Sequence, residues 1–274
     1  MFDRNVYIYD IYSGSPSKSQ RRSAHPDSAR DPTSTLRSFV FSLSQAKLHS
    51  GIPARSHAVD NDYLVSLEVD SIRVSMRELL IATRNEGKMP EIRHALLGVP
   101  FDIIDINDVP ELEGFEPHEH GSTYEENASI KAREYGLRAN VLTLADDSGI
   151  EVDALGGEPG VQSARYAEGT DADRNKKLLE TLEKVPDEKR GARFVCVIAI
   201  YDPSTQKLRT CRSEVYGRVT REPRGERPFG YDPIFLYDEA GKTGGEMTLA
   251  EKDRWSHRGR ALAKARKILL AEFT

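Results

Sequence analysis

The sequence predicts an α/β fold, and two observations support this prediction. In the first half of the main body, short apolar runs typical of strands alternate with segments whose apolar residues recur at helical spacing. The second half is richer in strand-like runs and closes on one long helical segment. No sequence repeat is found, so a solenoid or a propeller is not expected.

The first half of the body is expected to alternate strongly between strand and helix. Pro90 would stand in the first turn of a helix, where its missing N–H costs nothing. Thr123 and Glu126 form the pattern of a capping box at the start of a longer helix. We expect strands at Glu78–Thr83, Phe101–Ile106 and Val141–Ala145, and helices at Pro90–Leu97 and Thr123–Ala139.

The second half is expected to contain a hairpin between two helices. The turn residues 202–205 separate two strand-like segments, and Ser256 is a good N-cap for the last helix. We expect helices at Asp171–Leu182 and Ser256–Leu270, hairpin strands at Ala192–Tyr201 and Leu208–Tyr216, and short strand pieces at Val219 and Ile234–Leu236.

The two cysteines are predicted to be reduced, buried thiols. Cys196 and Cys211 are equidistant from the Pro203–Ser204 bond, so a tight hairpin would place the two thiols opposite each other. A metal site is not expected there, because companion ligands are missing nearby.

Composition limits the classes of function. The 274 residues allow a sizeable core, and 38% hydrophobic with 30% charged residues is ordinary for a globular protein. No apolar stretch approaches the roughly 18–20 residues of a membrane helix. The net charge of −5 gives no basic field, so neither a membrane nor a nucleic-acid partner is expected. A small anionic substrate remains compatible with local cations.

The first 75 residues differ from the body. Residues 13–37 are rich in Ser, Arg, Pro and Asp, which predicts disorder, and Leu64–Val69 is an isolated strand candidate. Asp3, Asp10 and the missing apolar segment argue against a targeting peptide, so a cytoplasmic location is expected. We divide the chain into 1–75, a disordered or dispensable extension, and 76–274, the functional domain.

An acidic motif, Asp146-Asp147-Ser148-Gly149, follows the strand predicted to end at Ala145. Two adjacent carboxylates at the end of a strand suit a divalent cation, and hard oxygen ligands favour Mg²⁺. Gly149 would allow close approach of backbone. The same residues also form turns readily, so the motif alone does not decide between the two interpretations.

The segment from Thr83 to Lys88 connects a predicted strand to a predicted helix. Free N–H groups at such a helix start suit phosphate, and Asn85, Gly87 and Lys88 would add donors, space and positive charge. The P-loop pattern is absent from the chain. An ordinary strand–helix connection is the alternative.

Two segments near the C-terminus suit a nucleobase. Phe229-Gly230-Tyr231-Asp232 places aromatic residues beside glycine, as base stacking requires, although Tyr231 could equally lie in the core. His257 and Arg258 would place cations in the first turn of a helix, against its dipole, unless an anion or acceptor lies opposite. A solvated helix start is the alternative for this pair.

Together these four segments resemble the inosine triphosphate pyrophosphatase family, in order and at similar spacing. The resemblance runs from about Met76 to the C-terminus, and residues 76–274 number 199 (274 − 75), close to the usual family length. It implies an elongated, twisted central mixed sheet flanked by helices, with two lobes and an active-site cleft between them. It also implies Mg²⁺ as cofactor and a homodimer.

The resemblance assigns roles to individual residues. Asp147 would be the catalytic base and a metal ligand, with Asp146 supporting the site. The second metal carboxylate would come from an acidic stretch where this chain departs from the family pattern, and among Glu111, Glu113, Glu116, Glu119, Glu125 and Glu126 we favour Glu119. The flanking His118 and His120 are expected to be solvated. The expected substrate-binding residues are Thr83, Arg84, Asn85, Glu86, Gly87, Lys88, Ser148, Phe229, Gly230, Tyr231, Asp232, Lys252, His257 and Arg258.

The resemblance further implies that residues 83–88 hold the triphosphate and that Phe229 stacks on a purine oriented by Asp232. Lys252, five positions before His257, would touch the substrate, and His257 with Arg258 would read the base. The predicted function is therefore Mg²⁺-dependent hydrolysis of ITP, dITP or XTP to monophosphate and pyrophosphate, which would cleanse the nucleotide pool.

Three alternatives remain open at this level. A Maf-like pyrophosphatase would prefer other bases, and the two C-terminal segments argue against it. A non-catalytic nucleotide-binding protein would lack a catalytic acid, whereas Asp147 is present. In the third alternative, residues 1–75 make the chain an interaction protein with a vestigial enzyme domain.

Overall fold

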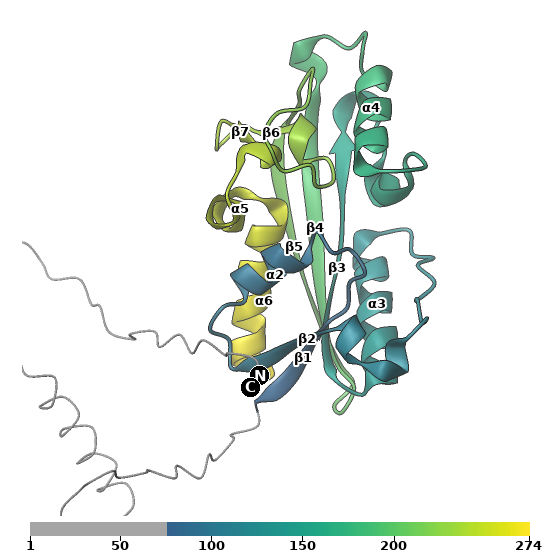
Figure 1. Cartoon of the computed structure of the whole chain (residues 1–274), viewed down its shortest axis with the longest axis vertical. Helices are drawn as coiled ribbons and strands as arrows, with labels where there is room; N and C mark the ends of the chain where they lie inside the picture. The colour runs from purple at the N-terminus through teal and green to yellow at the C-terminus, as the bar shows by residue number, and fades with distance from the viewer. Residues whose placement is uncertain (1–75) are drawn as a thin grey trace, which may run out of the picture. The chain divides into compact units, whose positions relative to one another are not determined.

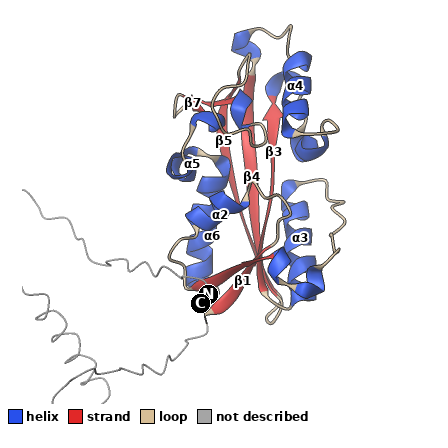
Figure 2. Ribbon diagram, in the orientation of Figure 1, coloured by secondary structure: helices blue, strands red, loops and turns tan. Residues whose placement is uncertain are grey.

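The computed structural model describes residues 76–274, whose strands form one seven-stranded sheet (Figure 2). The strand order is β2-β1-β3-β4-β5-β6-β7. β1 is parallel to β2 and β3, and all other neighbouring pairs are antiparallel, so the sheet is mixed as predicted. The bounds are β1 Arg77–Ile81, β2 Phe101–Asp105, β3 Leu142–Val152, β4 Gly191–Asp202, β5 Lys207–Val219, β6 Phe235–Tyr237 and β7 Lys242–Thr243.

Helices lie on both sides of the long central strands (Figure 1). α3 and α4 lie on one side of this view, and α2, α5 and α6 on the other. None of the helices between residues 76 and 274 has the length and apolar character needed to cross a membrane. The bounds are α2 Met89–Ala95, α3 Tyr124–Ala139, α4 Asp171–Thr181, α5 Leu249–Trp255 and α6 His257–Glu272. The predictions for residues 1–75, including the Leu64–Val69 strand, lie outside the described residues.

Helix starts follow the capping residues read from the sequence. Thr123 Oγ1 accepts a hydrogen bond from Glu126 N at 3.2 Å, and Thr123 N donates one to Glu126 Oε2 at 3.2 Å, which confirms the capping box of α3. Ser256 Oγ accepts from Gly259 N at 3.0 Å and so begins α6. The short helix α5, capped by Thr248, was not predicted because its seven residues are mostly polar.

The prediction that a strand stops at Ala145 is wrong. β3 runs for eleven residues, through the acidic motif, to Val152. β1 accompanies it only over residues 142–144, whereas β4 pairs with it over residues 143–152. This ladder satisfies the backbone groups of the acidic motif and overrides its turn propensity. The side-chain pair Asp146–Asp147 therefore stands on a strand, just past the end of β1.

The core is divided by the sheet into layers. Ala128 and Ala132 of α3 pack with odd-numbered residues of β4, such as Val195 and Val197. The α6 residues pack with even-numbered ones, such as Ile198. Because side chains alternate along a strand, neighbouring residues of β3 face different helices. A third cluster gathers under α4 at the other end of the sheet.

The β4–β5 hairpin forms as predicted, but its register differs from the tight turn that we considered. Cys196 lies opposite Ser213, and Cys211 lies opposite Ile198, so the two thiols are not directly across from each other. The residues 203–206 form a four-residue turn in which Gln206 adopts positive φ, and this shifts the register. Both thiols are free, and Cys196 is fully buried.

Candidate active site

A cavity of about 350 Å³ opens beside the end of β1, where β3 and β4 continue alone. Most of the predicted substrate residues line this cavity. Of the predicted set within residues 76–274, Glu86, Gly87 and Lys252 are not among the lining residues. The predicted residues that line it are Thr83, Arg84, Asn85, Lys88, Glu119, Asp147, Ser148, Phe229, Gly230, Tyr231, Asp232, His257 and Arg258.

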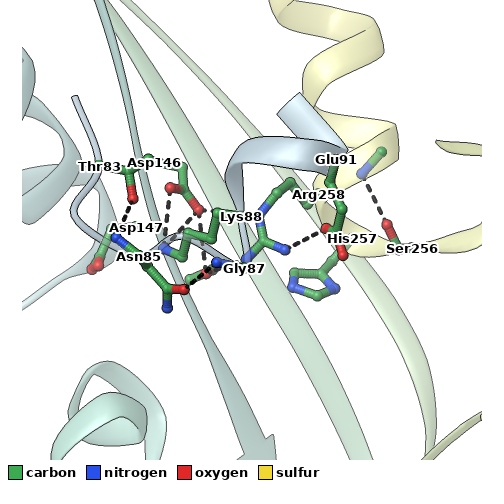
Figure 3. Close-up of polar contacts among 12 residues, drawn as sticks. Thr83, Asn85, Gly87, Lys88, Glu91, Asp146, Asp147, Ser256, His257 and Arg258 are labelled. Atoms are coloured by element: carbon green, nitrogen blue, oxygen red, sulfur yellow. Dashed lines mark hydrogen bonds and ion pairs between the residues drawn. The ribbon is translucent and has the colours of Figure 1, made fainter. Parts of the chain in front are cut away.

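The β1–α2 loop is shaped by its own side chains (Figure 3). Thr83 Oγ1 accepts from Asn85 N at 3.2 Å, and Asn85 Oδ1 accepts from Gly87 N at 3.1 Å. The loop therefore has one folded form that presents Lys88 inward. Arg84 is used elsewhere, because its guanidinium donates to the backbone carbonyls of Leu112 and Phe115.

The two adjacent acids face opposite sides of the sheet. Asp146 points toward α2 and α6, where Lys88 Nζ lies 2.9 Å and Arg258 Nε 3.3 Å from its Oδ2 (Figure 3). Burial raises the pKa of Asp146, but the charges of Lys88 and Arg258 outweigh it and hold the pKa well below its usual range. Asp146 is thus a permanent anion that positions two cations.

Asp147 faces α3 instead. Its Oδ1 lies 3.1 Å from Lys131 Nζ, whereas its Oδ2 is buried and receives no hydrogen bond from any residue in the described part of the chain. Burial raises the pKa of this carboxyl above its usual value, and Lys131 offsets only part of the effect. A partly unsatisfied, desolvated carboxylate is suited to bind a cation or accept a proton.

Lys131 also joins the second predicted metal ligand to the site. Its Nζ lies 3.3 Å from Glu119 Oε2, so one ammonium bridges Glu119 and Asp147. Burial lowers the pKa of Lys131, but the nearby charges of Asp147, Asp146 and Glu119 outweigh burial and raise the pKa above its usual value. The side chain therefore stays cationic. Sequence reasoning missed Lys131, although it lies one residue before Ala132 on the buried stripe of α3.

The donor set fits Mg²⁺. Among residues 76–274 no three His, Cys, Asp or Glu side chains are gathered as a complete metal site. Mg²⁺, however, keeps several waters and is often held by one or two carboxylates plus substrate phosphates. Asp147, with its unpartnered Oδ2, and Glu119 supply two such carboxylates on either side of Lys131.

Gly149 serves the packing of the site. A Cβ at this position would lie 2.3 Å from Gly160 O and 2.5 Å from Ser163 Oγ. The sequence predicted that Gly149 allows close approach of backbone, and the backbone that approaches is the 3₁₀ turn Gly160–Arg165. Ser163 Oγ in turn accepts from Ile150 N at 2.9 Å, which fixes this turn against β3.

The aromatic pair after Pro228 divides between cavity and core. Phe229 is half-buried, and its ring lies against Gly87, where a Cβ would come within 2.2 Å of it. The ring centroid is 5.5 Å from Lys252 Nζ and 5.7 Å from Arg258 Cζ. Tyr231 is buried, and its hydroxyl donates to Ser163 O at 2.8 Å. Of these two aromatic residues, Phe229 is therefore the one with the more exposed ring, while Tyr231 both lines the cavity and packs in the core.

Buried ion pairs link the base segment to α2, α5 and α6. Lys252 Nζ lies 2.5 Å from Glu91 Oε1 and also contacts Asp232, while Arg258 Nη1 lies 2.6 Å from Glu91 Oε2. Burial raises the pKa of Glu91, but Arg258 and Lys252 bring it below the usual value. Sequence reasoning missed Glu91, because an acid in the first turn of a helix is ordinarily explained by the helix dipole.

Arg258 is anchored but retains free donors. Its Nη1, Nε and Nη2 engage Glu91, Asp146 and Ser148, the last at 3.1 Å from Ser148 Oγ. A guanidinium has five N–H groups. Three are used in these bonds, so one N–H on each terminal nitrogen is left for a ligand in the cavity.

His257 is not a cation, contrary to the expectation from sequence. It is buried and stacks on Phe194 at 4.2 Å between centroids, with Tyr237 Oη 3.4 Å from its Nδ1. Burial, and then the charges of Arg258 and Lys252, lower its pKa well below the usual value. The helix start therefore carries one buried cation, Arg258, and one neutral ring.

Comparison with known proteins places the chain in a family. The model of the Ham1 family matches residues 79–268, and the chain belongs to this family, which confirms the resemblance seen in the motifs. A dITP/XTP pyrophosphatase of Symbiobacterium thermophilum is 47% identical over 199 residues, covering 72% of this chain and 98% of that protein. A dITP/XTP pyrophosphatase of Pseudomonas aeruginosa is 41% identical over 198 residues, with the same coverage of 72% and 98%.

A solved structure of a Ham1 protein has a similar fold. The Ham1 protein of Coxiella burnetii superposes with a TM-score of 0.63 at 38% identity, covering 71% of this chain and 99% of that one. The predicted fold class, a mixed sheet flanked by helices, is confirmed.

Proposed function

We propose that this protein hydrolyses non-standard purine nucleoside triphosphates such as dITP and XTP to the monophosphate and pyrophosphate. The observation that carries the proposal is one cavity lined by the Thr83–Lys88 loop, the Asp147 and Glu119 carboxylates, and the Phe229 ring. These are the three parts such a reaction needs: a phosphate holder, a site for activating water, and a platform for the base. The activity in the names of the two relatives is of the same class.

The phosphate end would be bound by donors and a fixed positive charge. Asn85 and Lys88 present such groups at the cavity, and Asp146 holds Lys88 in place. Asp147 and Glu119 would hold Mg²⁺, which neutralises phosphate charge when bound. Lys131 holds these two carboxylates together, and its ammonium group would also attract a phosphate that enters the cavity.

Asp147 would act as general base at the α-phosphorus. Burial raises the pKa of Asp147, which makes the carboxylate a better proton acceptor than an ordinary aspartate. The water that loses its proton to Asp147 attacks the α-phosphorus, and pyrophosphate leaves.

The base end would be held by stacking and by matched hydrogen bonds. Phe229 offers its ring to the purine. The two remaining N–H groups of Arg258 are donors only, so they match the 6-oxo group of hypoxanthine or xanthine and not the 6-amino group of adenine. Asp232, fixed by Lys252, would orient the purine from the other side.

Four further features belong to the proposal. The homodimer and the cytoplasmic location are expectations from the family resemblance and from the sequence, as is the lack of a nucleic-acid partner. The domain 76–274 would be sufficient for activity, since the family model lies wholly within it.

A substrate panel tests the proposal. Pyrophosphate release would be measured from dITP, XTP, ATP, GTP and CTP with Mg²⁺, with EDTA and with the Asp147→Asn protein as controls. We expect turnover of dITP and XTP well above that of ATP, abolished by EDTA and by the substitution. Equal turnover of all five nucleotides, or none of dITP and XTP, would contradict the proposal.

A further inference from the structure

The segment that carries Phe229 is held from α4, an element that sequence reasoning did not connect with the base. Asp171 Oδ2 accepts a hydrogen bond from Gly230 N at 2.6 Å. Asn175 Nδ2 donates to Gly230 O at 3.0 Å. The two side chains stand four residues apart on the same face of the helix, so they grip both polar groups of one residue.

The contact between α4 and Gly230 involves a buried polar side chain. Asn175 is only 5% exposed, and its Oδ1 is buried without a hydrogen-bond partner among the described residues. Leaving the Oδ1 end of a buried amide unpaired is unfavourable. The hydrogen bond from Asn175 Nδ2 to Gly230 O offsets part of this cost. Gly230 itself has φ of +55°, a conformation that glycine adopts without a steric penalty.

The residue gripped is the one that follows Phe229. The stretch from Arg221 to Pro228 is exposed, although Glu226 N donates to Gly245 O at 3.1 Å, and Phe229 O accepts from Asp232 N at 3.1 Å. On the cavity side the ring only rests on Gly87 and lies over Lys252 and Arg258. The two side-chain bonds from α4 to Gly230 add to these backbone contacts and hold the residue next to the Phe229 ring.

We propose that Asp171 and Asn175 are positioning residues for nucleotide binding: they fix Gly230 and so aim the Phe229 ring at the purine. This rests on the proposed function, in which Phe229 is the stacking platform. The attack step uses Asp147, Glu119 and Lys131, which lie on β3, the segment before α3, and α3 itself and not on α4, although Asp171 lines the same cavity. Loss of the grip should therefore raise KM and leave kcat nearly unchanged.

The test uses Asp171→Ala and Asn175→Asp in the full chain. A hydrogen bond to a charged acceptor predicts a rise in KM for dITP of about tenfold for Asp171→Ala, and the weaker amide bond about fivefold for Asn175→Asp. Asp171→Asn keeps an acceptor for Gly230 N, so its KM should stay within about twofold of wild type. In every variant kcat should stay within about twofold, because the effect is on binding alone.

Two control variants separate the grip from general damage to α4. Thr170→Ala removes the helix cap, whose Oγ1 accepts from Asp173 N, without touching Gly230. Lys176→Ala changes an exposed residue of the same helix. Neither should raise KM. An equal rise in KM for Thr170→Ala and Asp171→Ala, or a fall in kcat with unchanged KM, would overturn the inference.

Amide hydrogen exchange at Gly230 gives a readout that does not depend on turnover. Asp171→Ala should speed this exchange about tenfold, and Thr170→Ala should not. If wild type hydrolyses no dITP, the proposed function fails, and exchange alone then decides whether α4 holds the turn. Unchanged exchange in Asp171→Ala would overturn the inference whatever the activity.

Discussion

Replacing each of the two adjacent acids by asparagine should have opposite consequences. Both changes remove one negative charge and keep the side-chain shape. Asp147→Asn should abolish turnover with little effect on the fold, whereas Asp146→Asn should weaken the fold. The prediction follows from the opposite directions in which the two side chains point from β3.

The magnitudes can be worked from the contacts. Asp146 is fully buried as a side chain and faces both Lys88 and Arg258, so its loss leaves two cations short of a partner. Breaking a buried pair in this way costs about 3–5 kcal/mol of stability. The pKa of Asp147 is raised by burial, so its ionised form opposes folding at neutral pH. A neutral asparagine removes that cost, and Lys131 keeps Glu119 as a partner.

For turnover, Asp147→Asn and not Asp146→Asn should have the larger effect. Loss of a general base lowers kcat by about 10²–10⁴-fold, and weaker metal binding would add to this. Asp147→Asn should therefore unfold at the same denaturant concentration as wild type, or a higher one, while losing at least about a hundredfold in kcat for dITP.

The assay is paired: urea unfolding of both variants, and dITP turnover at saturating Mg²⁺. Turnover of Asp147→Asn within about threefold of wild type would refute its role as base, since the general-base effect is far larger. A stability of Asp146→Asn equal to that of wild type would refute the account of its buried ion pairs.

Three further predictions follow from other contacts. A fragment beginning at Met76 should fold and hydrolyse dITP like the full chain, and aggregation or inactivity of this fragment would show that residues 1–75 are a structural part. Arg258→Ala should lower kcat/KM for ITP by about tenfold or more and that for ATP much less; equal losses would mean that Arg258 does not read the base. Arg77 Nη2 lies 2.9 Å from Asp202 Oδ2, and the pKa of Asp202, which burial raises, is brought to about 2 by Arg77 and Ser204. Because this pKa lies below the value of about 3.9 in unfolded chains, the carboxylate stabilises the fold above about pH 4 and loses that effect as the pH falls toward 2. Urea unfolding should accordingly show a larger deficit for Asp202→Asn at pH 7 than at pH 3, and a deficit independent of pH would contradict the assignment.

The sequence located the elements well wherever local signals and tertiary packing agree. The start of α3 is specified by Thr123 and Glu126, and that of α6 by Ser256, so both could be predicted from neighbours in the chain. The strand β3 could not, because Asp146 to Gly149 favours a turn locally, and only pairing with β4 extends it. The one available signal was the length of the predicted strand Ala192–Tyr201, because a strand that long needs a neighbour longer than the five residues predicted for Val141–Ala145.

The residues of the candidate site also divide into those that the sequence predicted and those that it did not. The roles of motif residues such as Asp147 and Phe229 were predicted because their motifs resemble those of the family in order and spacing. Lys131 and Glu91 were missed, because a lysine or glutamate in a helix is ordinarily solvated, and only the packing of α3 and α2 against the sheet turns them inward. Asp171 and Asn175 act on Gly230 from 59 and 55 residues away, a separation that no local pattern reveals.

The products formed from dITP test the central claim most directly. Phosphorus-31 NMR of the complete reaction with Mg²⁺ distinguishes attack at the α-phosphorus from attack at the γ-phosphorus. The account predicts dIMP and pyrophosphate in equal amounts, with no dIDP at any time and no reaction in Asp147→Asn. Formation of dIDP and orthophosphate, or equal rates for the wild-type and Asp147→Asn proteins, would contradict it.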